Sequence, residues 1–198
     1  MTYDIIIVGA GPAGIFTALE LLRRGYTIDG DHRILLVEKG KAVEKRHCPK
    51  AEVGHCVGCK PSCAITTGFS GAGAFSDGKL SLSYEVGGDL PELIGEELAQ
   101  NLIDYTDGIY LEFGAAPEVE GITDNEEIKN IRKKAIEASL KLVDCPIRHL
   151  GTEKAQELYL AIQNHLLDAG VEILFNTECD NILLDGSTCT GVMLRDKT

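Results

Sequence analysis

Basic residues and long apolar runs are both scarce in this chain. Its 198 residues include 19 Lys and Arg against 31 Asp and Glu, a formal net charge of -12 at pH 7. Nucleic-acid backbones are bound by clustered Lys and Arg, which displace counterions, so this balance argues against a nucleic-acid partner. No stretch approaches the length that crosses a bilayer, and the apolar run at residues 5–10 is too short for a signal peptide. We therefore expect no membrane partner, and the cytoplasm is the simplest location.

The expected absence of an export signal also decides how the seven cysteines are interpreted. Structural disulfides are typical of secreted proteins, so thiols or metal ligands are favoured here. No internal repeat, low-complexity tract or linker interrupts the sequence. Because 44% of the residues are hydrophobic, the chain can bury a core, and one domain over residues 1–198 is the expected organisation.

The first forty residues have the pattern of a β-α-β unit. Residues 3–8 form a continuous β-branched apolar run, which predicts a central strand covered on both faces. Residues 12–24 carry apolar side chains at helical spacing, and Gly25 ends this predicted helix. A polar loop then leads to a second buried strand at residues 33–38. Strand, tight turn, helix and strand predict a Rossmann-like α/β fold with a parallel sheet.

Three glycines between the first strand and the helix form a G-x-G-x-x-G motif. Gly9 permits a tight turn, Gly11 lets the backbone approach a pyrophosphate at the helix N-terminus, and Gly14 lets the helix pack closely on the strand. Glu38 closes the second strand, where a carboxylate accepts hydrogen bonds from ribose hydroxyls. An ordinary glycine-rich turn is the competing interpretation. The predicted dinucleotide-binding residues here are Gly9, Gly11, Pro12, Ala13, Gly14, Glu38 and Lys39.

These residues leave the identity of the nucleotide open. An acid at position 38 disfavours a 2′-phosphate, so NADP is not expected at this motif although Lys39 and Lys41 are nearby. FAD and NAD are both compatible with it. The spacing between the motif and the acid is somewhat long, which a loop containing residues 29–31 explains.

The remainder of the chain alternates between helical and extended patterns, with a helical insertion expected at about residues 85–145. Thr152 is a plausible N-cap for the last helix, and Gly170 is positioned to end it. The predicted helices are residues 90–106, 125–143 and 152–168, and the predicted strands are residues 81–84, 146–150, 171–175, 181–184 and 190–194.

Four cysteines are clustered in a loop rich in Pro and Gly. Their spacing is C-x7-C-x2-C-x3-C, and four thiolates in such a loop bind a [4Fe–4S] cluster or tetrahedral zinc. His47 and His55 are alternative zinc ligands. A reversible disulfide between two of these cysteines, or a purely structural role, are the other interpretations. The predicted metal ligands are Cys48, Cys56, Cys59 and Cys63.

A glycine- and alanine-rich stretch at residues 68–80, GFSGAGAFSDGKL, carries a resemblance to a known family. It resembles the FAD-dependent dehydrogenases of the glutathione-reductase-like, two-dinucleotide-binding flavoprotein superfamily. It is also similar to the Ser-Gly-Gly-Gly-type loop that lies along the flavin ring in related flavoproteins. The cysteine-rich lead-in and residues 147–152, followed by a helix, a strand and a small β-meander, fit as well. Family members are commonly longer, so the resemblance implies an FAD-binding domain that is incomplete at its C-terminal end.

The resemblance implies a flavin site along this stretch. Backbone N–H groups of small residues can reach the flavin ring only where side chains are not bulky. Lys79 is expected to stabilise negative charge on reduced flavin, Asp77 or Ser76 to hydrogen-bond the ring, and Arg148 and His149 to face the substrate side. A simple hairpin turn at residues 76–79 and a structural role for His149 are the competing interpretations. The flavin-contacting residues expected in the loop are Ser70, Gly71, Ala72, Gly73 and Ser76.

These patterns together predict a flavin-dependent oxidoreductase that acts on a small-molecule substrate, with NAD(P)H as a candidate electron donor. A second hypothesis is a metal- or thiol-based redox module that uses the cysteine cluster. A third is a non-catalytic nucleotide-binding fragment. Neither the substrate nor the oligomeric state can be derived from the sequence.

Overall fold

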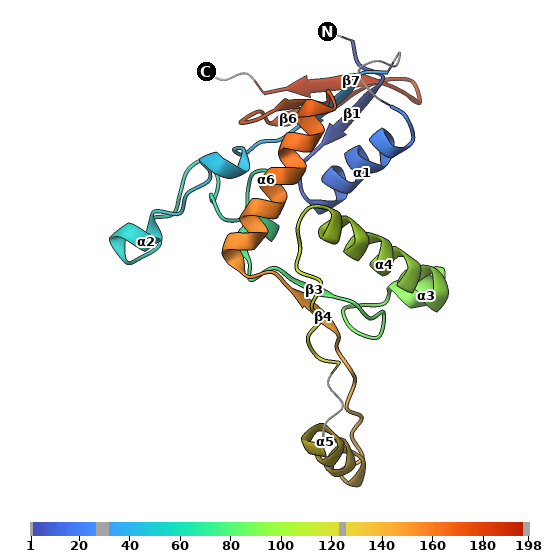
Figure 1. Ribbon diagram of the computed structural model, residues 1–198. Helices are drawn as coiled ribbons and strands as arrows, with labels where there is room; N and C mark the ends of the chain where they lie inside the picture. Colours follow the sequence, from blue (N-terminus) through green and yellow to red (C-terminus); the bar gives the residue numbers. More distant parts are fainter. Residues whose placement is uncertain (1, 27–31, 123–125, 196–198) are drawn as a thin grey trace. The chain divides into compact units, whose positions relative to one another are not determined.

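The β-α-β pattern at the start of the chain is confirmed in the computed structural model, which describes residues 2–26, 32–122 and 126–195 (Figure 1). β1 (Ile5–Val8) leads through the glycine motif to α1 (Pro12–Arg23), and β2 (Ile34–Val37) follows. The loop at residues 29–31, which the sequence uses to explain the long spacing to Glu38, lies outside the described residues.

The parallel sheet has the strand order β1-β2-β5, where β5 is Glu172–Leu174. β2 is the middle strand, paired with β1 on one side and β5 on the other, and all four of its residues are buried. Among the residues that the structure describes, β1 instead lies at an edge of this sheet, and Val8 is exposed. The prediction of a central first strand is therefore wrong, and the second strand is the central one.

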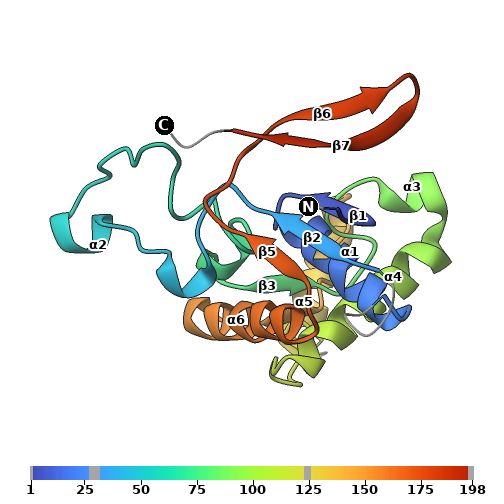
Figure 2. The same cartoon turned by 90° about the horizontal axis from the view of Figure 1, so that it is seen from above.

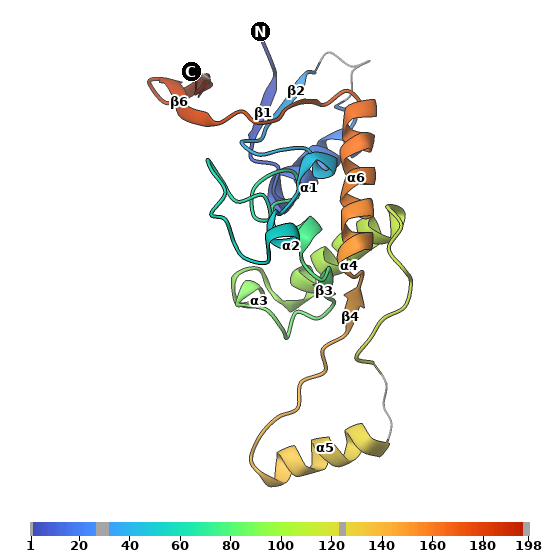
Figure 3. The ribbon, with the colours of Figure 1, turned by 90° about the vertical axis from the view of Figure 1, so that its left-hand side faces the viewer.

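Helices α1 and α6 (Thr152–Asp168) lie on the same face of this sheet (Figure 2 and Figure 3). The strand order requires this, because right-handed crossovers that proceed in one direction place their helices on one side. Each helix buries one apolar stripe. The buried side chains are Ile15, Ala18 and Leu19 of α1 and Ala155, Leu158, Tyr159, Ile162 and Leu166 of α6.

The chain divides into two compact units. The first comprises Met1–Ser76 and Ala155–Thr198, and the second comprises Asp77–Lys154. The first unit contains the parallel sheet and the short elements that follow β2, which are Val43–Lys45, α2 (Lys50–Val53) and Gly73–Phe75. The second unit includes the region predicted as a helical insertion. A single domain over residues 1–198 stays a prediction.

The second unit has more helices than the sequence pattern resolves. Residues 90–106 were expected to form one helix, but the structure has α3 (Leu90–Ile94) and α4 (Glu96–Glu112). Gly95 separates the two with a φ of 86°, which a helix interior does not accommodate. α5 (Glu126–Glu137) has no buried residue among its described positions.

Two strands of the second unit pair although they are far apart in sequence. β3 (Lys79–Ser81) is antiparallel to β4 (Ile147–His149), so the extended segment predicted at residues 146–150 is confirmed. The predicted strand at residues 81–84 is wrong in its bounds, because the paired residues begin at Lys79. A local hairpin at residues 76–79 is also wrong, since β3 pairs with β4 rather than with a neighbouring strand.

The predicted β-meander is a two-stranded hairpin in the residues that the structure describes. β6 (Cys179–Asp185) and β7 (Thr188–Leu194) pair antiparallel, and the pair Asp185 and Thr188 flanks the turn (Figure 2). Across the described ranges, none of the helices combines the length and apolar character that a membrane span requires. The Rossmann-like α/β fold expected from the sequence is confirmed.

Candidate functional site

The glycine motif forms an open turn between β1 and α1. Gly9 follows the strand with a φ of 98°, a conformation that side chains rarely adopt. A Cβ on Gly14 would lie 2.0 Å from the carbonyl oxygen of Gly9, so this position accepts only glycine. A Cβ on Gly11 would meet nothing within 4 Å. The motif therefore combines close helix–strand packing at Gly14 with free space at Gly11.

The N-terminus of α1 is left uncapped by side chains. Gly11 is the N-cap residue, Pro12 begins the helix, and no side chain of the described residues caps this end. The first turn also contains no acidic residue. The first N–H groups of a helix have no acceptor within the helix, and the helix dipole adds partial positive charge there. This end is accordingly suited to a bound anion such as a diphosphate.

Glu38 connects the glycine turn to the end of β2. Glu38 is only 5% exposed, and its carboxylate accepts hydrogen bonds from the N–H of Ala10 at 2.8 Å and of Gly40 at 2.7 Å. A carboxylate has about four acceptor positions, so two remain for other donors. The acid predicted to bind ribose thus points toward the glycine turn. Contact with a ribose stays a prediction, as does the role of the exposed Lys39.

The small-residue loop lies directly against the glycine turn. The N–H of Ser70 donates to the carbonyl of Ala10 at 2.7 Å, and a Cβ on Gly71 would lie 3.9 Å from the Cα of Gly11. Ser70 is fully buried with a φ of 74°. Two sequence segments that were predicted separately to contact the cofactor are therefore adjacent in the structure.

The remaining residues of this loop are held by local contacts. The hydroxyl of Ser70 accepts a hydrogen bond from the N–H of Ala74 at 3.0 Å. Ser76 donates its hydroxyl proton to the carbonyl of Gly73 at 3.2 Å. A Cβ on Gly73 would approach the hydroxyl of Tyr159 on α6 to 2.8 Å, so the loop packs closely on that helix. Ala72 is exposed.

Arg46 is the residue of this site that the sequence reasoning missed. Its side chain is buried, and its guanidinium donates to the carbonyls of Ala64 at 2.9 Å, Ile65 at 2.5 Å and Phe69 at 2.6 Å. It also lies 4.4 Å from the ring centre of Phe75. Arg46 therefore fixes the backbone on both sides of the small-residue loop. It stands in a run of charged residues, Glu44-Lys45-Arg46-His47, in which no pattern singles it out.

The charge of Arg46 has little compensation from the described protein. Burial lowers the pKa of its guanidinium. The negative charges of Glu38 and Cys63 raise this pKa, but only through electrostatic attraction at a distance. Hydrogen bonds from the N–H groups of Ile65 and Thr66 lower the pKa of the Cys63 thiol. A buried cation bonded to carbonyls adds positive potential to the same loop region.

The predicted catalytic residues all lie in the second unit. Lys79 forms an exposed ion pair with Asp77 at 2.7 Å, which lowers the pKa of Asp77 and raises that of Lys79. Lys79 lies opposite His149 in the β3–β4 register, and His149 Nδ1 is 3.5 Å from Glu120. The structure brings Asp77, Lys79 and His149 close together. Their catalytic roles stay predictions.

Arg148 is buried and paired within the second unit. It is 4% exposed, its guanidinium binds both carboxylate oxygens of Asp107, and it donates to the carbonyl of Ala116 at 2.5 Å. The hydrogen bonds that the Arg148 guanidinium donates to Asp107 raise the pKa of Arg148. This side chain holds β4 to α4 within the second unit. A position of Arg148 on the substrate side stays a prediction.

Replacing Arg148 with methionine should lower the free energy of unfolding by about 2 kcal/mol. The replacement leaves the partly buried carboxylate of Asp107 without its partner, and a buried charge that loses its partner is costly. Chemical denaturation of R148M beside an exposed-pair control, Arg132→Met, measures the effect. Equal stability of the two variants would contradict the structural role of Arg148.

The four clustered cysteines are not gathered into a metal site. Cys48, Cys56, Cys59 and Cys63 are all free thiols, and no group of three potential ligands is close enough to hold a metal ion within the described ranges. His47 is instead hydrogen-bonded to Glu52 at 3.0 Å, and His55 to the carbonyl of Val53. Iron–sulfur or zinc binding stays a prediction.

Comparisons with known proteins agree with this fold. No family model matches the sequence. An uncharacterized protein from Clostridium beijerinckii is 40% identical over 76 residues, which are 38% of this chain and 13% of that protein. The match is too short to show a family.

Solved structures of two kinds of oxidoreductase are similar over almost the whole chain. Glycine oxidase from Bacillus cereus has a TM-score of 0.50 and 19% identity, and the match covers 98% of this chain and 53% of the oxidase. A 3-ketosteroid-delta4-(5alpha)-dehydrogenase from Rhodococcus jostii has a TM-score of 0.55 and 12% identity over 98% of this chain and 42% of the enzyme. Identities this low show the fold alone. The chain spans about half the length of these enzymes.

Proposed function

We propose that this chain binds FAD and forms part of a flavin-dependent oxidoreductase. The observation that carries the proposal is the contact between the glycine turn and the small-residue loop, through the Ser70 N–H and the Ala10 carbonyl. One long ligand with a diphosphate and a flavin ring can contact both segments at once. The fold shared with an oxidase and a dehydrogenase supports the same class.

The residues at this edge fit a dinucleotide. Open space at Gly11 and the uncapped end of α1 suit the diphosphate, and Glu38 keeps free acceptor positions for ribose hydroxyls. Bound flavin would supply electron or hydride transfer. The protein would orient the flavin, and the small side chains of residues 70–73 would leave room for its ring. The substrate, and NAD(P)H as electron donor, belong to the same proposal, with Lys79, Asp77 and His149 as its catalytic residues.

Titration of the purified protein with FAD tests the proposal. We expect saturable binding that quenches flavin fluorescence, and NAD should bind more weakly. Replacing Glu38 with alanine should weaken FAD binding about tenfold or more, because a charge-assisted hydrogen bond contributes about 1.5–3 kcal/mol. Glu157→Ala, an exposed acid on α6, is the matched control. Thermal unfolding of each variant shows whether the protein is folded during the titration.

Two outcomes would overturn the proposal. One is a folded protein that binds no FAD at concentrations where flavoproteins are saturated. The other is preferential binding of NAD with turnover that needs no flavin. Unchanged FAD affinity in the Glu38 variant would contradict the proposed contact between Glu38 and the ribose. It would also contradict the orientation proposed for the nucleotide.

A further inference from the structure

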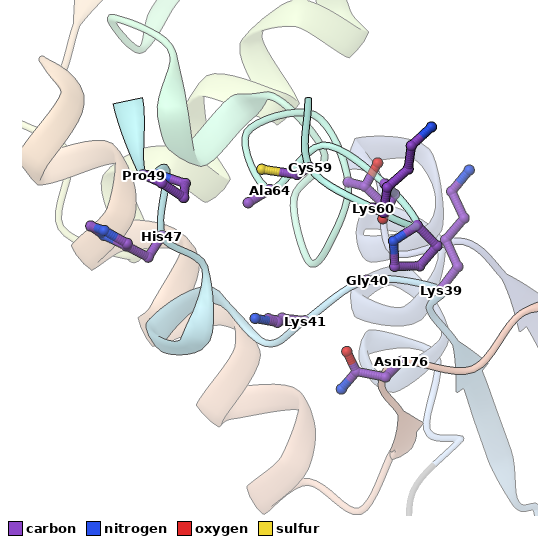
Figure 4. Close-up of a pocket in the computed structure, with 12 residues that line it drawn as sticks. Lys39, Gly40, Lys41, His47, Pro49, Cys59, Lys60, Ala64 and Asn176 are labelled. Carbon is purple, nitrogen blue, oxygen red and sulfur yellow. The ribbon is translucent and has the colours of Figure 1, made fainter. Parts of the chain in front are cut away.

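α3 and α4 of the second unit carry exposed apolar side chains that have no part in the proposed cofactor site. The pocket shown in Figure 4 does belong to that site, because Lys39 beside Glu38 lines it. On α4, apolar residues at i, i+4 and i+7 share one helix face and are exposed, and we call them the α4 stripe: Leu98, Leu102 and Tyr105. Exposed apolar side chains that gather on one face mark an interaction site.

The apolar surface continues from α4 onto α3. Leu93 of α3 is 81% exposed. A pocket of about 200 Å³ is lined by residues of the loop after β3, of α3 and of α4, and all of its lining residues are uncharged. Leu90 lines this pocket and is itself exposed, so the pocket opens beside the apolar side chains. A pocket of this kind can receive an aliphatic side chain of a docked partner.

The surroundings of the α4 stripe are acidic. Residues 89–112, which include both helices, contain several Asp and Glu but no Lys, Arg or His. A second copy of the same face would therefore meet like charges, which oppose association. The partner that fits is a helix that has an apolar stripe and basic residues around it.

α5 of the same unit is such a helix. Three of its apolar residues lie at i, i+3 and i+7, and we call them the α5 stripe: Ile128, Ile131 and Ala135. None of the described residues of α5 is buried. Ile131 is 45% exposed. Since the α4 stripe is exposed as well, α5 does not cover it within one copy of the chain.

The charges of α5 complement those of α3 and α4. Residues 129–134 contain Lys and Arg but neither Asp nor Glu, and helical spacing places Arg132 and Lys134 on opposite sides of the α5 stripe. Arg132 forms an exposed ion pair with Asp144, whereas Lys134 forms none within the described ranges. Exposed pairs contribute little free energy, so these basic side chains can exchange partners when another acidic surface approaches.

The two segments that lead to and from α5 are joined at their base. Glu120 and Ile147 exchange two backbone hydrogen bonds, at 2.8 and 2.9 Å. A Cβ on Gly121 would lie 2.3 Å from the carbonyl oxygen of Cys145, so the two segments are also in close contact there. α5 is thus the end of an extension with a fixed base, and such an element can be exchanged between copies of one chain.

We propose that α5 of one copy binds the α3–α4 face of a second copy, and that the second copy does the same in return. The α5 stripe contacts the α4 stripe, and the basic residues 129–134 face the acidic surroundings. This reciprocal exchange gives a two-fold dimer with two equivalent contacts. The inference does not depend on FAD binding.

Sedimentation velocity over a range of protein concentrations tests the proposal. We expect the parent chain to be a dimer that weakens as salt is added, because opposite charges attract across the contact. Leu102→Asp and Ile131→Asp should each raise the dimer dissociation constant at least about 30-fold, since each places a carboxylate in both apolar contacts. Leu184→Asp on β6, at a position that is 65% exposed, is the matched control and should leave the dimer unchanged. Thermal unfolding shows that each variant is folded.

A mixture of the two variants distinguishes exchange from other contacts. The Leu102→Asp copy keeps an intact α5 stripe, and the Ile131→Asp copy keeps an intact α4 stripe. One of the two contacts can therefore form without a carboxylate in the mixed pair. We expect the mixture to dimerise more tightly than either variant alone.

Four outcomes would overturn the proposal. A parent chain that stays monomeric would show that α5 does not bind a second copy. A dimer that is lost in Ile131→Asp but kept in Leu102→Asp would indicate pairing of α5 with α5. An equal loss in Leu184→Asp would place the contact on a different surface or reduce the effect to net charge. A mixture no tighter than the separate variants would exclude the reciprocal exchange.

Discussion

Replacing Gly11 with alanine should weaken FAD binding at least about 100-fold while the protein remains folded. Gly11 has a φ of -74° and a ψ of 177°, which alanine adopts without strain, and its Cβ would meet no atom within 4 Å. Alanine is a poorer N-cap than glycine, so the free energy of unfolding should fall by no more than about 1 kcal/mol. The free space that admits the methyl group is the space assigned to the diphosphate. A steric clash of about 3 kcal/mol between the added methyl group and the diphosphate corresponds to the expected loss of FAD affinity.

Gly14→Ala is the matched control for this prediction, because the same methyl group is added three residues later. There the Cβ would lie 2.0 Å from the Gly9 carbonyl oxygen, a backbone atom that cannot move without shifting the strand end. We expect a loss of about 3 kcal/mol in unfolding free energy, or no folded protein. Denaturation and FAD titration of both variants separate packing from binding. FAD affinity in Gly11→Ala equal to that of the parent would show that the diphosphate does not lie at this turn.

Replacing Arg46 with methionine should destabilise the protein by about 3 kcal/mol and weaken FAD binding. The guanidinium donates to three backbone carbonyls, and its loss leaves the Phe69 oxygen without a donor in a buried position. Because Phe69 precedes Ser70, the small-residue loop should lose its fixed position against the glycine turn. Equilibrium denaturation and FAD titration of the folded variant measure the two effects.

Two further variants separate positioning from stability. Arg46→Lys keeps the charge but cannot donate in the fork geometry of arginine, so its FAD affinity should also fall. Arg24→Met removes an exposed guanidinium that is paired with Glu20 and should change stability by less than about 1 kcal/mol. If Arg46→Lys lost stability yet bound FAD normally, Arg46 would be a structural residue without a role in positioning the loop.

The elements that the sequence predicts well are those with local causes. The spacing of apolar residues and the glycine motif, all within forty residues, predict β1, α1 and β2. Gly14 has the close packing that the motif requires. α6 begins at Thr152 and ends at Asp168, as its period and the following Gly170 indicate. These signals need no knowledge of distant contacts.

The features that escape prediction depend on segments far apart in the sequence. Residues 3–8 are apolar enough for a central strand, and only the strand order shows that β1 is at an edge. Lys79 begins a strand because Ile147–His149 pairs with it, which no local pattern reveals. Arg46 and Arg148 are both buried. Burial is predicted from the spacing of apolar residues, and a charged residue does not contribute to that pattern. Their environment becomes visible only in three dimensions.

Glu38 also ties two parts of the chain together before any ligand arrives. One oxygen receives the N–H of Ala10 in the first β-α turn, and the other receives the N–H of Gly40 beyond the second strand. The side chain is thus locked in a single rotamer by its own backbone. A sugar hydroxyl that reaches it meets an acceptor already aimed, and ordering a free side chain would otherwise cost about 0.5–1.5 kcal/mol. If the proposed ribose contact exists, Glu38 is therefore an acceptor that the protein holds in place before the ligand binds.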